Sequence, residues 1–376
     1  LQIVEWTGSG SVTFILVFFN MGLSYFLYHL GKRRKKGKGR GSILDRFCPD
    51  LYVSLGMLLF LFAVFLSTLA SQKKQTAMLK AALIQPAAPV FIDDNPKGVE
   101  LSWKYLEEEM ADAASYEGMD LIIWPESALA TVSALGNEGG RIFAERLVRD
   151  AKLPVLGGAL AEVGEYSYNA MLRISPANGV SSTFYAKRHL VPFGEYVPME
   201  SVFPFFRKIV PYEGEFTAGE KATVLPVSAR GMTWWAGSLI CYEDAYASLA
   251  RENVENNADF HLVVTNNAWF GEEGGAYQHA AHSVLRAIET RRPVVRCGNA
   301  GWSGWIDAYG NIRKVLLDDR GSIYFRGWGM VSPESPVLWK GKPTFYVSHG
   351  EWFTVLSIIF TLLSIGIPLL RRPSVV

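Results

Sequence analysis

The sequence is poor in cysteine, with three residues in a chain of 376, and this scarcity argues against a disulfide framework. Cys241 and Cys297 are far apart in one large segment, and Cys48 lies outside it. The chain contains no CxxC or HxxxH pattern, so we expect no metal site. It also lacks a glycine-rich phosphate loop, which gives no reason to expect a nucleotide cofactor.

Charged side chains are missing from three long segments, residues 11–30, 51–70 and 352–370. Each is about 20 residues long, which is the length that a helix needs to cross the hydrocarbon core of a bilayer. A soluble core helix rarely runs so far without a polar face. The sequence therefore predicts three transmembrane helices and a protein associated with the lipid bilayer.

Basic residues are concentrated in the short stretch 32–40, KRRKKGKGR, between the first two predicted spans. The positive-inside rule places such a loop in the cytoplasm, and Arg371 and Arg372 after the third span agree. Setting aside the seven basic residues of that stretch leaves 30 Lys and Arg against 36 Asp and Glu. No basic surface remains to support nucleic-acid binding.

These spans predict three parts of the chain. Residues 1–75 form a membrane region with helices at 11–30 and 51–70 and a cytoplasmic loop at 31–50. Residues 76–350 form one domain on the opposite side, which is the periplasm in a bacterium, and residues 351–376 add the third span and a short cytoplasmic tail. Residue 1 is Leu, and no signal peptide precedes the first span, so we expect that the chain lacks earlier membrane spans.

The large segment alternates short apolar runs with helical patterns. Strands are predicted at 78–86, 120–127, 154–160, 169–175, 183–190, 232–240, 259–266, 293–299 and 303–309, and helices at 98–117, 138–152, 244–257 and 276–292. In the first of these helices Trp103, Leu106, Met110 and Ala113 form one apolar face. This pattern predicts an α/β domain whose sheets are covered by helices.

Three residues fall where predicted strands end: Glu126 after DLIIWP, Lys187 after TFYA and Cys241 after WWAGSLI. A thiol attacks as the thiolate, which needs a nearby base or cation. Lys187 supplies a cation and Glu126 a proton acceptor, so the three side chains form a candidate catalytic triad. Each also has a purely structural interpretation: a buried strand thiol for Cys241, a helix cap for Glu126 and a solvated strand-end charge for Lys187.

The surroundings of these residues, WPES, YAKRHLVPFGEYVP and SLICYEDAY, resemble the Glu-Lys-Cys triad of the nitrilase superfamily. PFGEYVP, CYE and the stretch 265–296 resemble more narrowly the apolipoprotein N-acyltransferases, and QIVEWTGSGSVTFILVFFN resembles a membrane span of that family. The resemblance implies a four-layer α-β-β-α sandwich between transmembrane helices. The stretch GNAGWSGW at 298–305 departs from the family pattern, and its Trp302 and Trp305 are bulky.

The resemblance also implies a reaction. Glu126 takes the thiol proton of Cys241, which attacks an ester carbonyl of a phospholipid, while Lys187 and a backbone N–H near Tyr242 hold the oxyanion. The resulting thioester passes its acyl chain to the α-amino group of the diacylglyceryl cysteine of a lipoprotein, and no cofactor is needed. Glu195, Glu243, Tyr242 and Asn169 are implied as supporting residues. A first-turn helix carboxylate remains an alternative for Glu243.

The segment 199–214, MESVFPFFRKIVPYEG, is apolar and aromatic with two basic residues. Its alternatives are a core loop and a lid that dips into the bilayer surface, and we expect the lid. Phe203, Phe205 and Phe206 would then face lipid. We also expect Trp302 on the substrate- or lipid-facing side.

Two other function classes fit parts of the sequence. One is a membrane-tethered amidohydrolase of the nitrilase type, in which water resolves the acyl-enzyme. The other is an inactive membrane scaffold, or a conjugal-transfer protein, that retains the nitrilase fold. The triad alone separates neither from an acyltransferase.

Overall fold

The computed structural model describes residues 1–35, 49–72, 75–88, 96–129, 136, 138–200, 202–203, 205 and 216–370 of the chain. The chain divides into two compact units. One comprises Leu1–Lys74 with Thr344–Val376, and the other comprises Gln75–Pro343. The two are described separately below.

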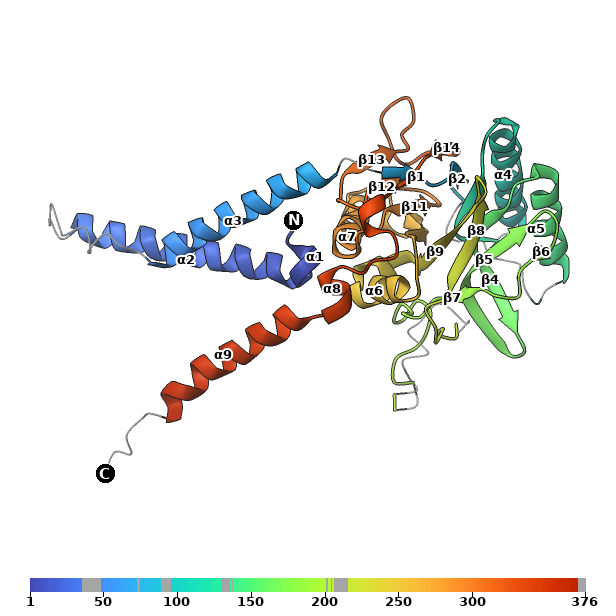
Figure 1. Ribbon diagram of the computed structural model, residues 1–376. Helices are drawn as coiled ribbons and strands as arrows, with labels where there is room; N and C mark the ends of the chain where they lie inside the picture. Colours follow the sequence, from blue (N-terminus) through green and yellow to red (C-terminus); the bar gives the residue numbers. More distant parts are fainter. Residues whose placement is uncertain are drawn as a thin grey trace. The chain divides into compact units, whose positions relative to one another are not determined.

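The first unit is helical (Figure 1). Its helices are α1 (Val4–Thr7), α2 (Gly10–Lys35), α3 (Pro49–Ser71), α8 (Phe345–His349) and α9 (Trp352–Leu370). Two segments, Gly10–Lys32 of α2 and Leu51–Ala70 of α3, are long and apolar enough to cross a membrane. In α9 the apolar segment Trp352–Ile367 is shorter, so the third predicted span stays a prediction.

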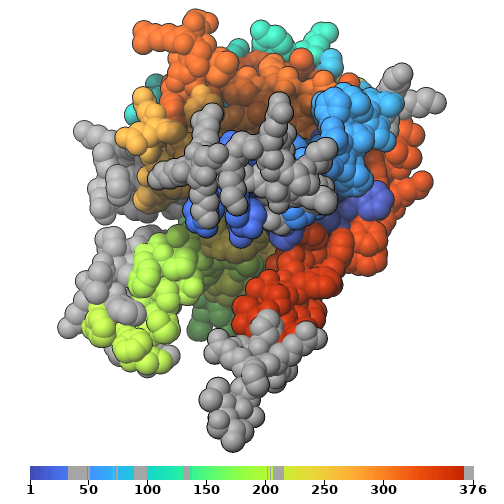
Figure 2. Space-filling view, turned by 90° about the vertical axis from the view of Figure 1, so that its left-hand side faces the viewer, coloured from blue at the N-terminus to red at the C-terminus, as the bar shows by residue number. Residues whose placement is uncertain are grey.

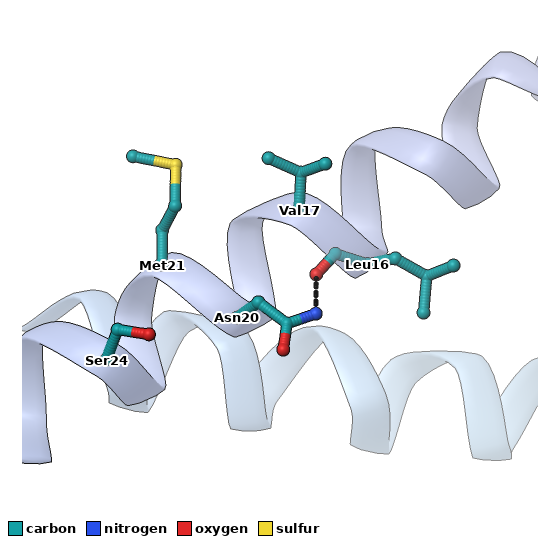
Figure 3. A pocket seen from close by; sticks show the side chains of 5 residues that line it. All are labelled: Leu16, Val17, Asn20, Met21 and Ser24. Carbon is teal, nitrogen blue, oxygen red and sulfur yellow. Dashed lines mark hydrogen bonds between the residues drawn. The ribbon is translucent and has the colours of Figure 1, made fainter.

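The surface of α2 carries a shallow hollow lined by Leu16, Val17, Asn20, Met21 and Ser24 (Figure 3). Asn20 carries an amide side chain within the apolar stretch of α2. Its Nδ2 donates a hydrogen bond to the carbonyl oxygen of Leu16 at 2.7 Å, one turn earlier. Because the amide nitrogen is satisfied within its own helix, the cost of placing Asn20 in an apolar environment is reduced.

The second unit contains two large sheets and a small one among its described residues (Figure 1). The first sheet has the order β14-β2-β3-β4-β5-β6, with β7 also pairing with β5, and the second has the order β13-β12-β11-β10-β9-β8. Strand β1 (Gln75–Ala77) pairs with β15 (Glu334–Pro336). The first sheet uses β2 (Ala81–Gln85), β3 (Leu121–Leu129), β4 (Val155–Val163), β5 (Tyr166–Ser175), β6 (Gly179–Val180), β7 (Tyr185–Ala186) and β14 (Gly327–Val331). The second uses β8 (Val224–Ala229), β9 (Met232–Ile240), β10 (Phe260–Thr265), β11 (Val294–Gly298), β12 (Gly304–Ile306) and β13 (Ile312–Val315).

The strand side chains alternate between two different cores. Leu83 and Ile123 of the first sheet meet Leu262 and Val295 of the second in a core between the sheets. The neighbouring residues on the same strands point to opposite faces, because the side-chain period of a strand is two. On the first sheet these outer residues pack against α4 (Pro96–Ser115) and α5 (Glu138–Ala151). On the second sheet they pack against α6 (Ala247–Glu255) and α7 (Gly275–Thr290).

The resulting layer order is helix, sheet, sheet, helix, so the predicted four-layer α-β-β-α fold is confirmed. Some details of the sequence prediction are wrong. The helix expected from residue 244 begins at Ala247, because Cys241–Ala245 form the 3-10 helix η3. The strand expected over 183–190 is reduced to Tyr185–Ala186. Strands β1, β6, β8, β13, β14 and β15 were not predicted.

Candidate active site

Cys241 lies at a sharp turn where β9 ends and η3 begins. Its φ is +55°, in the left-handed region that a residue with a Cβ rarely adopts. The preceding residue, Ile240, is paired in parallel with Val264 of β10, so the turn stands at the end of two neighbouring strands. Such strained conformations persist only where the surrounding structure fixes them, and they are common at functional sites.

Glu126 lies in a bulge of β3. The strand pairs regularly with β4 as far as Trp124, which lies opposite Gly157, and pairing resumes at Leu129 opposite Ala159. Four residues of β3 therefore face the single residue Gly158. A Cβ on Gly158 would lie 2.5 Å from the Cα of Glu126, so glycine is needed for this bulge. The bulge redirects the Glu126 side chain.

The Glu126 carboxylate is buried and held from several sides. Its Oε2 accepts a hydrogen bond from the backbone N–H of Asn266 at 2.8 Å, just after β10. Its Oε1 lies 3.2 Å from Nζ of Lys187 and 2.9 Å from Nδ2 of Asn169. These three contacts together fix the orientation of the Glu126 carboxylate.

Lys187 follows β7 and is buried, with 1% of its surface exposed. Its Nζ contacts Glu195 Oε1 at 2.8 Å as well as Glu126. Burial disfavours the ammonium, but the carboxylates of Glu126 and Glu195 outweigh it and raise the pKa of Lys187 above its ordinary value. Lys187 therefore stays positively charged at neutral pH.

Asn169 of β5 completes this arrangement. Its Nδ2 donates to Oε1 of Glu195 at 2.9 Å, and so touches the same two carboxylate oxygens as Lys187. Glu195 Oε2 also accepts from the backbone N–H of Val191 at 2.8 Å. A cation and an amide thus lie between the two carboxylates and compensate part of the hydration that both lose on burial.

The Cys241 thiol is nearly buried, and burial is the main cause that raises its pKa to about 12. The charge of Glu126 raises it further, while Lys187 and the hydroxyl of Thr265 lower it. The resting side chain is therefore a thiol rather than a thiolate. Nucleophilic attack at neutral pH then requires a base that takes the proton during the attack, and Glu126 is the carboxylate that interacts with this thiol most strongly.

Tyr242 and Glu243 directly follow Cys241 in η3. The ring of Tyr242 lies beneath Lys187, with Nζ 5.5 Å from the ring centroid, and its hydroxyl donates to the carbonyl oxygen of Leu190 at 2.8 Å. The Glu243 carboxylate accepts four hydrogen bonds, from the backbone N–H groups of Arg188, His189 and Ile240 and from the Tyr185 hydroxyl. It therefore joins the chain around Lys187 to the turn that carries Cys241.

The predicted lipid-facing residues have three outcomes. Phe203 and Phe205 are exposed and form an edge-to-face pair with ring centroids 6.0 Å apart. Figure 2 shows the yellow-green segment around residue 200 at the surface. Phe206 lies outside the described residues. Trp302 is 2% exposed and packs with Leu239 and Val263 in the core beneath α7, so its predicted lipid-facing position is wrong.

The sequence analysis missed Asn266 and Asn299, which hold the loop that donates a hydrogen bond to Glu126. Asn266 provides the N–H described above, and its own side chain accepts from Asn299 Nδ2 at 3.1 Å. Asn299 in turn exchanges two hydrogen bonds with the backbone of Ala88. The available signal was the pair of asparagines at the end of an apolar strand, in DFHLVVTNN. Among the residues that the structure describes, no group of three or more His, Cys, Asp or Glu is arranged to hold a metal ion.

Comparison with known proteins agrees with this geometry. Residues 80–315 match the model of the carbon-nitrogen hydrolase family. Apolipoprotein N-acyltransferase from Bdellovibrio bacteriovorus is 30% identical over 277 residues, covering 70% of this chain and 49% of the relative. The enzyme of the same name from Chlorobaculum tepidum is 30% identical over 374 residues, covering 93% and 66%. The chain thus spans about half to two thirds of the length of these relatives.

Solved structures show the same fold at low sequence identity. An amidase from a Nesterenkonia species superposes with a TM-score of 0.52 at 17% identity, covering 76% of this chain and 97% of the amidase. At this identity the likeness concerns the fold alone.

Proposed function

The chain belongs to the carbon-nitrogen hydrolase family, and from that membership we propose that it is a membrane-bound acyltransferase that forms a thioester on Cys241. The acyl donor is a phospholipid. The acceptor is the α-amino group of the diacylglyceryl cysteine at the N-terminus of a lipoprotein. This proposal follows the names of the relatives. They are apolipoprotein N-acyltransferases, and their alignments cover most of this chain.

In the first half-reaction the sulfur of Cys241 bonds to the ester carbonyl carbon while Glu126 takes the thiol proton. The carbonyl oxygen becomes an oxyanion, and the ammonium of Lys187 and a backbone N–H at the η3 turn stabilise it. Such preorganised donors are worth about 3–4 kcal/mol each in the transition state. The carbon–oxygen bond then breaks, and Glu126 returns the proton to the departing lysophospholipid oxygen.

In the second half-reaction the neutral amine of the acceptor attacks the thioester carbonyl. Glu126 takes a proton from the amine nitrogen, and the sulfur leaves and is protonated again. The products are an amide and the free thiol, so no oxidant, metal or nucleotide enters the balance. A thioester is reactive toward amines, which allows the transfer without ATP.

The observation that carries the proposal is the placement of Lys187. One buried ammonium lies 3.2 Å from Glu126 and 2.8 Å from Glu195, and its charge also acts on the Cys241 thiol. A fixed cation beside a thiol and a base is what covalent acyl transfer requires. A buried thiol without a neighbouring cation and base would not be activated for acyl transfer.

The test is the intact mass of the purified chain after incubation with phospholipid in nanodiscs. We expect an added acyl mass in the wild type and none in Cys241→Ala. The matched control is Cys297→Ala, since Cys297 is also a buried thiol, and its hydrogen bonds go to the backbone carbonyl oxygens of Ile84 and Ile123. A diacylglyceryl-cysteine peptide should remove the adduct much faster than water does. Absence of an adduct in the wild type would overturn the proposal, and rapid loss to water would indicate an amidohydrolase.

The membrane setting is part of the proposal. Segments of α2 and α3 are long and apolar enough to anchor the chain in a bilayer. We assign residues 76–350 to a catalytic domain in the periplasm and 351–376 to a third span with its tail. The inner membrane of a bacterium would provide both the donor phospholipid and the lipoprotein acceptor.

The exposed Phe203 and Phe205 are assigned to a lid at the lipid surface. We expect the double variant Phe203→Ser and Phe205→Ser to slow acylation by vesicle-bound phospholipid about tenfold, with little effect on a short soluble ester. The control is Tyr166→Ser, because Tyr166 is a similarly exposed aromatic residue on β5. Equal rates of the double variant and the wild type on vesicles would exclude the lid.

A further inference from the structure

A polar stripe on the buried side of α7 has no part in the reaction described so far. His279, Ser283 and Arg286 are separated by four and three residues, which places them on one face of the helix. All three are buried, and this face is turned toward η3, the 3-10 helix that begins with Cys241. A buried polar face has to be compensated by partners, and here the partners belong to the turn of the nucleophile.

The principal partner is Asp244, three residues after Cys241. Its Oδ2 lies 2.5 Å from Nη1 of Arg296 and accepts from the Ser283 hydroxyl at 2.6 Å. Its Oδ1 lies 3.2 Å from Nε2 of His279. Arg286 holds the backbone of the same turn by donating to the carbonyl oxygen of Ala245 at 2.9 Å. The turn is thus fixed by both its side chain and its main chain.

The other ring nitrogen of His279 faces a different loop. Nδ1 lies 3.1 Å from Nδ2 of Asn267. The two ring nitrogens of His279 therefore face two different partners, Asn267 at Nδ1 and Asp244 at Nε2. Asn267 packs closely against Gly301. A Cβ added to Gly301 would lie only 2.7 Å from the Cβ of Asn267.

Asn267 is the neighbour of Asn266, whose backbone N–H donates to Glu126. A continuous set of contacts therefore leads from the turn of Cys241 through Asp244, His279 and Asn267 to the loop that holds Glu126. It spans η3, α7 and η4 (Asn267–Phe270). The two ends are the nucleophile and the base of the proposed reaction.

We propose that Asp244, His279 and Asn267 are positioning residues. They hold the nucleophile, Cys241, and the base, Glu126, at a fixed position relative to each other. The inference rests on the proposed roles of Cys241 and Glu126, not on the identity of the acyl donor. Both residues need such support, because Cys241 has a left-handed φ and Glu126 lies in a bulge. Neither conformation is stable by itself, so the surrounding contacts decide whether the two side chains meet.

The test uses Asn267→Ala, which leaves the pair of Asp244 and Arg296 intact. The readout is the rate of alkylation of Cys241 by iodoacetamide, measured by peptide mass on the full chain in detergent. We expect a rate about tenfold below that of the wild type at pH 7, because misplacing a proton acceptor by about 1 Å is costly. The matched control is Asn253→Ala, which removes a buried amide that donates to Ser238 of β9 at 3.1 Å.

The pH profile separates positioning from general loosening of the fold. The pKa of the Cys241 thiol is raised to about 12, so Glu126 is needed most near neutral pH. The ratio of wild-type to Asn267→Ala rates should therefore shrink as the pH rises toward 10.5 and hydroxide takes over. For Asn253→Ala we expect a ratio near one at every pH. A constant ratio for Asn267→Ala, or equal effects of the two variants, would overturn the inference.

His279→Gln provides a second variant, and it tests whether the contacts act as one set. If either substitution alone disrupts the whole set of contacts, the second substitution should add nothing. Cys241 in the double variant His279→Gln with Asn267→Ala should then be alkylated no more slowly than in the slower single variant. A double variant whose slowing is the product of the two single effects would show that the residues act independently. Because alkylation needs no lipid, failure of acyl transfer would leave this result standing, and the two proposals fail separately.

Discussion

The two faces of η3 carry two adjacent buried acids, Glu243 and Asp244, and they differ in what surrounds them. Glu243 accepts from three backbone N–H groups and one tyrosine hydroxyl. Asp244 faces Arg296 and His279. Burial raises the pKa of Glu243 despite its donors. Burial also opposes the charge of Asp244, but Arg296 and His279 outweigh it and lower the pKa of Asp244 to about 2.

This difference shows that burial alone does not decide the state of a carboxylate. Neutral donors orient a buried acid but compensate only part of its lost hydration, whereas a cation reverses the sign of the shift. The Glu243 face ties Lys187 to the nucleophile, and the Asp244 face ties α7 to the same turn. Four experiments test this difference between the two acids.

The largest effect is expected from Arg296→Met, because it leaves the buried charge of Asp244 without its main partner. Removing one member of a buried ion pair costs about 3–5 kcal/mol of unfolding free energy. The measurement is thermal unfolding in detergent, followed by tryptophan fluorescence. The control is Arg292→Met, since Arg292 donates to the carbonyl oxygen of Ala258 rather than to a carboxylate. Equal losses in the two variants would contradict the expectation.

On the other face, Glu243→Gln should cost about 2–3 kcal/mol of unfolding free energy. The amide NH₂ of glutamine must face donors whichever way it is turned, since both oxygens of Glu243 accept two hydrogen bonds each. We also expect slower alkylation of Cys241, because the chain around Lys187 would move. Unchanged stability in the same unfolding assay would mean that the four donors are satisfied in another way.

Acid should affect the Asp244 face in a defined range of pH. Its pKa is lower in the folded chain than in the unfolded chain, so the stabilisation is present above about pH 4 and is lost as the pH falls toward 2. The loss amounts to about 2–3 kcal/mol for a shift of this size. Midpoints of unfolding measured from pH 6 to pH 2 should show a steeper fall in the wild type than in Asp244→Asn. Parallel curves would argue against the paired charge.

The smallest effect is expected from Tyr185→Phe, which removes one of the four donors to Glu243. A single buried hydrogen bond contributes about 1 kcal/mol. The remaining three backbone donors should keep η3 in place, and alkylation of Cys241 should change by less than about threefold. A loss as large as that of Glu243→Gln would show that the tyrosine hydroxyl dominates this face.

Strand periodicity and helical faces are local properties, so the sequence pattern predicted an α/β domain whose sheets are covered by helices, whereas the four-layer order was predicted from the family resemblance. Glu126, Lys187 and Cys241 were predicted as a group because each follows an apolar run, and in the structure the ion pair of Glu126 and Lys187 acts on the thiol of Cys241. The prediction for Trp302 was wrong, since a tryptophan in a glycine-rich stretch has no local signal that tells a core position from a surface one. Asn266 and Asn267 were missed for a related reason, because their partners come from distant elements.

The lengths and patterns in the sequence were enough to predict that part of the chain is apolar enough to span a membrane, that the rest is an α/β domain, and that Glu126, Lys187 and Cys241 each follow a predicted strand. These follow from the lengths of apolar runs and from the period of the side chains. The sequence did not reveal that neutral donors orient Glu243 and that an arginine pairs with Asp244, because these partners meet only in the folded chain. The two residues are adjacent in the chain, but their charges depend on groups contributed by β7, α7 and β11, which only folding brings within hydrogen-bonding distance.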